Sequence, residues 1–269
     1  MNVLILTDFS KVAHNAASYA LRFLENVPAS FFLLNIETLN FKGEAEDYAK
    51  EKKGLALEKL EQEIDNLKKL TPNKKHTFQA YFSEENLVNS TRRYVHEKKI
   101  DLIVMGAAGR EYPQNAILGH HTYEIIRKIR CNLLAVSEGS EYSKPEKLVL
   151  PIDYSASFED KIFRFFDNPA IVKEAKITVL ELTGSVKKPI PVETPRDMMA
   201  NQLSPGKVKF MEVDESAICN EELLLEMQRK FNMIVILGKN LSVCDRLLHS
   251  RYGVCTAISN KLPVLVLHG

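Results

Sequence analysis

The sequence predicts an α/β protein made of two similar doubly wound parallel-sheet domains. Short apolar runs of strand length alternate with segments whose apolar residues recur at helical spacing. That alternation is typical of a parallel sheet with helices on both faces. The pattern then restarts, because residues 147–155 repeat the character of residues 3–10: each is an apolar run that ends in Asp, an aromatic residue and Ser. A chain of 269 residues is long enough for two domains of ordinary size.

In the first half, each expected strand is a short run of buried-strand character followed by a helical pattern. The expected strands cover residues 3–6, 31–36, 76–82, 102–105 and 133–136. A long charged helix is expected over residues 44–70, with an apolar stripe on one face. Ser83 is expected to cap the helix that follows the third strand.

A polar stretch before Pro145 is expected to link the halves, which gives domains at residues 1–140 and 145–269. The expected strands of the second half cover residues 147–152, 175–182, 207–213, 233–237 and 262–267. The segment 183–206 contains four prolines where the first half has its long helix, so we expect a surface loop with at most a short helix. A binding lid is the alternative for a loop of this length.

Composition narrows the range of partners. The formal net charge is +1, so charge gives no indication of binding to nucleic acid or to an anionic membrane surface. No apolar run approaches the roughly 20 residues that span a bilayer, and the N-terminus has the pattern of a core strand rather than a signal peptide. The four cysteines show no CxxC spacing, so buried thiols in a reducing cytoplasm are expected.

One loop carries a functional pattern. Gly106 and Gly109 follow an expected buried strand, and Gly119 precedes an amphipathic helix. Strand, glycine loop and helix together form a unit that holds a phosphate at a helix N-terminus. Glycine suits such a loop because the backbone turns tightly and a ligand can approach its N–H groups. A connection whose glycines serve only the turns is the alternative.

This G-x2-G-x9-G spacing, with Asp8 ending the first strand, resembles the universal stress protein family, and the repeated pattern resembles its tandem type. The resemblance implies flavodoxin-like, nucleotide-hydrolase-like domains packed as a pseudo-dimer, with the last strands of the two sheets side by side. It also implies a cytoplasmic stress-response protein. One branch of the family binds ATP, and the glycine motif marks that branch.

The resemblance also implies a binding site for an adenine nucleotide in the first half. Asp8 would lie near the ribose or adenine edge, and the backbone of Ile36 would meet the adenine. Gly106 and Gly109 would let the loop approach the ribose and phosphates. The turn that opens the helix and holds the phosphates would consist of Gly119, His120, His121 and Thr122.

His120 departs from the family pattern, which has Ser or Thr at this position. An imidazole cannot copy a hydroxyl, although it can donate to a phosphate when suitably protonated. Because of this departure, binding of ATP, with or without Mg, is less expected than binding of AMP. The second half lacks the motif: its second glycine position, counted from Gly238, falls on Leu241, and its third, counted back from Pro263, falls on Ser250. We therefore expect a degenerate partner domain.

No catalytic residue is predicted, since the sequence contains no GxSxG, HExxH or P-loop signature. At most, slow ATP hydrolysis is expected by resemblance. The leading hypothesis is an adenine-nucleotide-binding signalling module with intramolecular domain pairing, a homodimer being a further option. The alternative is an interaction or scaffold protein that binds no nucleotide and acts through an unknown protein partner. A metal or small-molecule site at His120 and His121 is a third hypothesis, but no further metal ligand is identifiable nearby.

Overall fold

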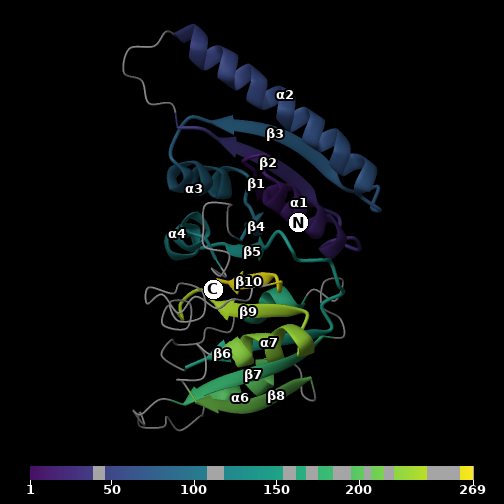
Figure 1. Ribbon diagram of the computed structural model, residues 1–269, viewed down its shortest axis with the longest axis vertical. Helices are drawn as coiled ribbons and strands as arrows, with labels where there is room; N and C mark the ends of the chain where they lie inside the picture. Colours follow the sequence, from purple (N-terminus) through teal and green to yellow (C-terminus); the bar gives the residue numbers. More distant parts are fainter. Residues whose placement is uncertain are drawn as a thin grey trace.

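The computed structural model describes residues 1–38, 46–107, 118–153, 162–167, 175–183, 195–202, 207–214, 221–240 and 261–268. These residues build one ten-stranded sheet in the order β3-β2-β1-β4-β5-β10-β9-β6-β7-β8, which runs through the whole molecule (Figure 1). The strands of the first half are β1 (Asn2–Leu6), β2 (Ser30–Ile36), β3 (Thr77–Ser83), β4 (Leu102–Gly106) and β5 (Asn132–Val136). Those of the second half are β6 (Lys147–Ile152), β7 (Lys176–Thr183), β8 (Val208–Asp214), β9 (Met233–Leu237) and β10 (Val264–Leu267).

The two halves meet at the middle of the sheet. Every neighbouring pair of strands is parallel except β5 and β10, which pair antiparallel with Leu134 opposite Leu265. Read outward from that junction, both halves have the same strand order, with the first strand of each half in the middle of its own five. The C-terminal strand β10 is therefore an interior strand, and the edges of the sheet are β3 and β8.

Helices cover both faces of the sheet. In the first half these are α1 (Lys11–Phe23), α2 (Glu46–Leu70), α3 (Leu87–Glu97) and α4 (His120–Lys128), with α3 and α4 on the opposite side from α1 and α2 (Figure 1). In the second half, η1 (Ile162–Asp167) and α6 (Pro195–Gln202) contribute to the same core as α1 and α2, and α7 (Glu221–Lys230) to the same core as α4.

Successive strand residues feed two separate apolar cores, as the alternation of side chains along a strand requires. On β1, Val3 and Ile5 join the core beneath α1 and α2, whereas Leu4 and Leu6 join the core beneath α3 and α4. All four are buried. Burial on both faces explains why these strands are continuous apolar runs in the sequence.

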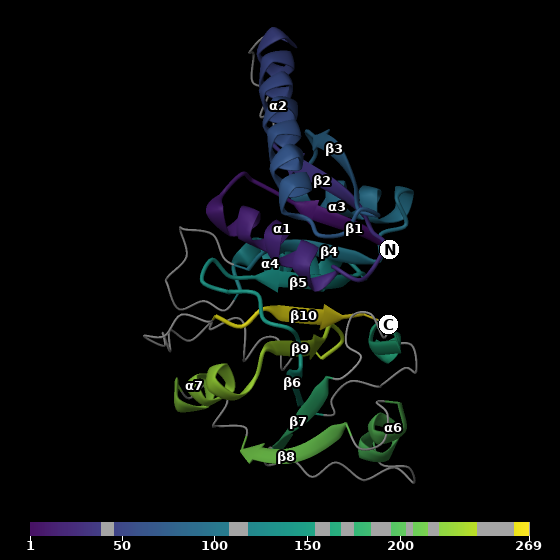
Figure 2. The same cartoon turned by 90° about the vertical axis from the view of Figure 1, so that its right-hand side faces the viewer.

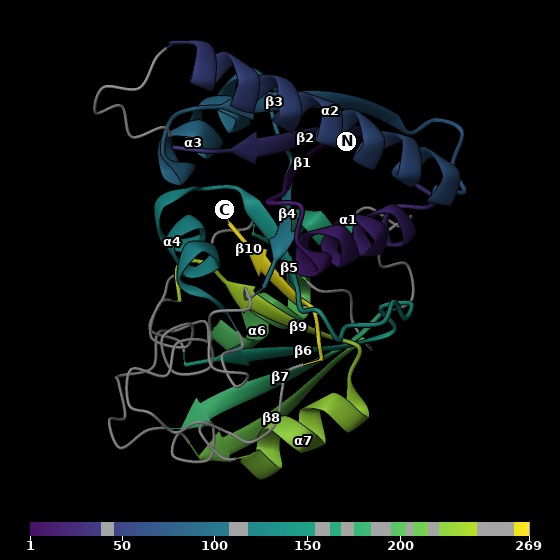
Figure 3. The ribbon, with the colours of Figure 1, turned by 45° about the horizontal axis from the view of Figure 1, so that its top comes forward.

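The long helix α2 begins at Glu46, within two residues of the expected start, and its buried stripe includes Leu60, Ile64 and Leu67. It lies across β3 and β2, as Figure 3 shows from above. Its N-terminal part extends beyond the sheet (Figure 2). The helix therefore packs through only part of its length.

Helix α1 is also in contact with the second half. The Asn15 amide donates to the carbonyls of Ser137 (2.9 Å) and Ser140 (3.0 Å) in the linker, and the ring of Phe23 stacks on Phe165 of η1, with centroids 6.3 Å apart. The second half thus supports the helix that follows the first strand.

At the end of β10, the His268 imidazole packs against Gly238. A Cβ atom on Gly238 would lie 2.3 Å from the ring. The backbone N–H of His268 donates to Asn132 Oδ1 of the first half at 2.9 Å. Burial, with Arg130 and Lys239 nearby, lowers the pKa of His268 from its ordinary value to about 4. The histidine at this junction is therefore neutral at pH 7.

Most of the expected elements are present. Strands β4 and β9 begin and end within one residue of the prediction, and α6 is the short helix allowed in the proline-rich segment. The sequence also predicts a helix after Asp153, from apolar residues at helical spacing between 158 and 166. Residues 154–161 lie outside the described residues, and residues 162–167 form the 3-10 helix η1. Cys131 is a buried free thiol, and the other three cysteines lie outside the described residues. No described helix is long and apolar enough to cross a bilayer.

Candidate functional site

The candidate site lies where the strand order of the first half reverses. The chain leaves β1 through α1 toward β2 on one side, and it returns through α3 to β4 on the other side of β1. The carboxyl ends of the neighbouring strands β1 and β4 therefore flank the point of reversal, and we call the place between them the crevice. Open parallel sheets bind their ligands at this point.

A hydrogen-bonded turn follows β1. The Asp8 carboxylate accepts from the backbone N–H of Ser10 (3.0 Å), and the Thr7 hydroxyl accepts from that of Phe9 (3.1 Å). Phe9 has φ 63°, in the left-handed region that costs a non-glycine residue energy. Ser10 then caps α1 by accepting from Ala13 N. The turn keeps Asp8 exposed at the crevice, while the helix cap is Ser10 rather than Asp8.

The far side of the crevice is formed by the end of β4 and the start of α4. The backbone N–H of Gly119 donates to Ala107 O (2.6 Å), and the Thr122 hydroxyl donates to Gly106 O (2.9 Å). Gly106 also packs tightly against α1, because a Cβ atom there would lie 3.0 Å from Val12. These contacts hold the helix start directly on the strand end.

The N-terminus of α4 has the polarity that favours an anion. Gly119 is the N-cap residue, no side chain of the described residues caps the helix, and its first turn contains no acidic residue. Backbone N–H groups at such a helix start, with the helix dipole, attract negative charge. His120 and His121 are exposed there, and their ring centroids lie 6.1 Å apart.

The third hypothesis, a metal site at His120 and His121, gains no further ligand from the described residues. Among the residues that the structure describes, no group of three or more His, Cys, Asp or Glu side chains is arranged to hold a metal ion. Two adjacent exposed imidazoles at a helix start do not supply the convergent set that a metal needs.

The ends of β2 and β3 extend the row of strand ends away from the crevice. The backbone N–H of Glu37, the residue after Ile36, donates to Ser83 O (3.0 Å). The Glu37 carboxylate pairs with Lys52 of α2 (2.7 Å). Ile36 is therefore at a strand end directly beside β1, with its side chain partly buried.

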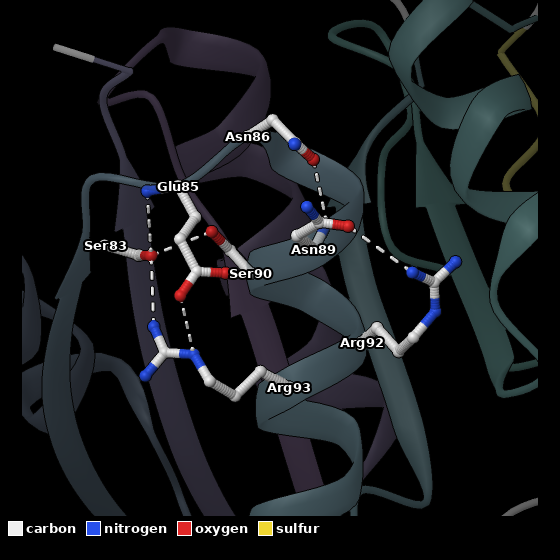
Figure 4. Close-up of polar contacts among 7 residues, drawn as sticks. All are labelled: Ser83, Glu85, Asn86, Asn89, Ser90, Arg92 and Arg93. Atoms are coloured by element: carbon white, nitrogen blue, oxygen red, sulfur yellow. Dashed lines mark hydrogen bonds and ion pairs between the residues drawn. The ribbon is translucent and has the colours of Figure 1, made fainter.

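Ser83 has a different role from the one expected. The N-cap of α3 is Asn86, whose side chain accepts from Asn89 N at 2.9 Å. Ser83 ends β3, and its buried hydroxyl bonds Ser90 Oγ (2.8 Å) and Arg93 Nη2 (3.2 Å) (Figure 4). Arg93 is held in turn by Glu85 (3.2 Å). Both Ser83 and Asn86 precede the helix in the sequence. Asn86 is the cap because Glu84 and Glu85 form the turn between the end of β3 and the start of α3.

The structure brings together some of the predicted site residues. Gly106, Gly119 and Thr122 are in direct contact through hydrogen bonds of the β4–α4 connection. Thr122 is 2% exposed, so its hydroxyl is engaged inside the fold while its backbone belongs to the helix start. On the other side of the crevice, Asp8 follows the end of β1, and Ile36 ends the neighbouring strand β2. Gly109 lies outside the described residues.

The comparison with family models gives one match: residues 1–137 match the universal stress protein family. The chain belongs to this family. Among solved structures, a universal stress protein from Archaeoglobus fulgidus DSM 4304 is 12% identical with a TM-score of 0.64, covering 98% of this chain and 97% of its own. A functionally unknown protein from Pseudomonas aeruginosa PAO1 is 14% identical with a TM-score of 0.58, covering 99% and 92%. No curated protein matches the chain.

Both structural relatives cover nearly the full length of this universal stress protein. At these identities the likeness shows the fold alone, including the arrangement of a second α/β unit after the first. The family match itself ends at residue 137, one residue after β5.

Strand register corrects the expected positions of the glycine motif in the second half. Val3 pairs with Leu102 in the first half, and Leu148 pairs with Met233 in the second. Because residues 148–155 correspond to residues 3–10, the position of Gly106 is taken by Leu237 rather than Gly238. Counting three further places Asn240, not Leu241, at the position of Gly109. Ser250 lies outside the described residues. Both described positions of the motif thus carry side chains in the second half.

Proposed function

We propose that this universal stress protein binds an adenine nucleotide in the crevice between β1 and β4 of its first half, and that it acts in the stress response as a nucleotide-responsive signalling module. The observation that carries the proposal is the uncapped N-terminus of α4 opposite the Asp8 turn, at the reversal of strand order. The glycine spacing and the family membership support it independently.

The phosphate would be bound at the start of α4. Backbone N–H groups of the first helical turn donate to an anion, and the helix dipole adds to the attraction. His120 and His121 are exposed beside these groups, so each can add a donor, and a positive charge when protonated. Neither brings the hydroxyl usual at the position of His120. We therefore expect one phosphate, as in AMP, to fit better than the Mg-bound triphosphate of ATP.

The ribose would be bound by Asp8. One carboxylate oxygen, Oδ1, is used by Ser10 N, which leaves Oδ2 to accept from ribose hydroxyls. A carboxylate at a strand end opposite a phosphate-binding helix start is suited to this role. The adenine would extend toward the backbone of Ile36 at the end of β2. No residue in this arrangement is assigned to catalysis.

The second half would serve as a degenerate partner domain. Leu237 and Asn240 replace two motif glycines, so its loop cannot offer the same close backbone approach. Its contribution would be to pair β10 with β5 and to support α1 through Phe165, which stacks on Phe23.

Calorimetric titration of AMP, ADP and ATP, with and without Mg, tests the proposal. Wild type should bind at least one of them saturably, with AMP as tight as ATP or tighter. Asp8→Asn keeps an oxygen for the Ser10 N–H but removes the charge, so affinity should fall about tenfold, the loss of one charged hydrogen bond. Asp153→Asn, at the corresponding position of the second half, is the matched control and should leave affinity unchanged.

Two outcomes would overturn the proposal. Absence of heat with all three nucleotides would leave the interaction or scaffold protein as the function of this fold. Binding that Asp153→Asn weakens while Asp8→Asn does not would move the site to the second half.

A further inference from the structure

The buried amide of Asn35 links β2 to the Asp8 turn by a hydrogen bond. Asn35 is 7% exposed, and its Nδ2 donates to the carbonyl oxygen of Thr7 at 2.9 Å. The backbone N–H of Thr7 donates to Leu34 O at 3.0 Å. Both sides of Thr7 are therefore fixed by the neighbouring strand.

The Thr7 carbonyl belongs to the peptide group that leads into Asp8. Holding that carbonyl fixes the plane of the peptide and so the direction in which the Asp8 side chain leaves the backbone. The next residue, Phe9, takes up the left-handed conformation with φ 63°. Such a conformation persists only where surrounding contacts over-determine it, and the Asn35 bond is one of those contacts.

The second half has no amide side chain at the position that corresponds to Asn35. Val3 pairs with Phe31 and Leu148 pairs with Ile177, so the residue that corresponds to Asn35 is Glu181. An ionised carboxylate has no N–H to donate to a carbonyl. Glu181 is 7% exposed and lies 3.4 Å from Arg196 of α6 instead. The two halves therefore share an aspartate after the first strand, at residues 8 and 153, but only the first has the amide that orients it.

We propose that Asn35 is a positioning residue for the Asp8 carboxylate, and that it sets the selectivity of the site for a ligand with free ribose hydroxyls. The inference rests on the proposed function, since it assigns the ribose end of the same crevice. Asn35 makes no contact with the ligand. It acts by keeping Oδ2 of Asp8 in the direction of the crevice. The difference between positions 35 and 181 then contributes to confining binding to the first half.

The test compares AMP with its 2′,3′-dideoxy analogue by calorimetry in wild type, Asn35→Leu and Asp8→Asn. Wild type should prefer AMP about tenfold, because the analogue loses about one hydrogen bond to the charged Asp8 carboxylate. Asn35→Leu keeps the branched shape and the number of heavy atoms but removes the donor, so it should weaken AMP about tenfold and leave the dideoxy analogue nearly unchanged. In the Asp8→Asn background, Asn35→Leu should add little further loss, because both act on one interaction.

Glu181→Gln is the matched control for a change at the same register position of the other half, and it should leave both affinities unchanged. Asn35→Leu is accompanied by a urea denaturation curve so that binding is measured on folded protein. Equal weakening of AMP and the dideoxy analogue, or full additivity with Asp8→Asn, would overturn the inference and leave Asn35 a packing residue. If the wild type fails to bind AMP, that result would instead contradict the proposed function.

Discussion

Replacing Gly106 tests whether the first glycine of the motif serves packing or the ligand. A Cβ atom at this position would lie 3.0 Å from both methyl groups of Val12 on α1. Val12 is 5% exposed, so it cannot swing into solvent. The backbone of Gly106 is outside the left-handed region, so an alanine there causes no backbone strain and is disfavoured only by its contact with Val12.

The size of the effect follows from two opposing terms. Overpacking by one methyl group costs about 1–3 kcal/mol, and replacing glycine in a strand returns about 0.5–1 kcal/mol. Gly106→Ala should therefore lower the free energy of unfolding by roughly 0.5–2 kcal/mol. In a Val12→Ala background the added methyl has space, and the same change should cost nothing.

Urea denaturation of wild type, the two single variants and the double variant gives the coupling energy, provided that m is constant. Losses that simply add would refute the packing explanation. The double variant also separates the two roles. If it recovers stability but still binds AMP weakly, the glycine is needed for close approach of the ligand as well.

Two further predictions concern stability. The pKa of His268 is about 4 because the ring is buried, below the ordinary 6.5 that applies in the unfolded chain. The unfolded chain therefore gains a proton first as pH falls, so stability present above pH 6.5 should decline toward pH 4, by at most about 3 kcal/mol. His268→Phe should flatten that part of the urea-midpoint profile, and an unchanged slope would contradict the assignment. At the start of α3, Asn86→Ala should cost about 1 kcal/mol as the loss of an N-cap. Thermal unfolding should show no such loss in Asn89→Ala, whose backbone N–H still meets Asn86.

The alternation of short apolar runs with helical patterns was sufficient to predict the layers and most strands. Strands such as β4 and β9 are buried on both faces, so their apolar character is continuous in the sequence and their ends are sharp. Helix starts were less predictable. Ser83 and Asn86 are both good N-cap residues, and only the length of the turn after β3 decides between them.

The polar contacts around the site depend on strand neighbours that the sequence does not place together. Asn35 is one polar residue inside an apolar run, and its role follows only from the pairing that puts β2 beside β1. The engagement of the Thr122 hydroxyl by Gly106 O likewise requires the fold, because 15 residues separate them. In the second half, counting from Gly238 gave positions shifted by one residue, and strand register corrected the motif to Leu237.

Nucleotide binding in the first half is tested residue by residue by amide chemical-shift changes on adding AMP to the isotopically labelled protein. Resonances of Asp8, Ile36, Gly106 and residues 119–122 should shift and saturate together, and those of the corresponding residues 153, 182 and 237 of the second half should not move. Saturating changes centred on the second half, or none anywhere, would contradict it.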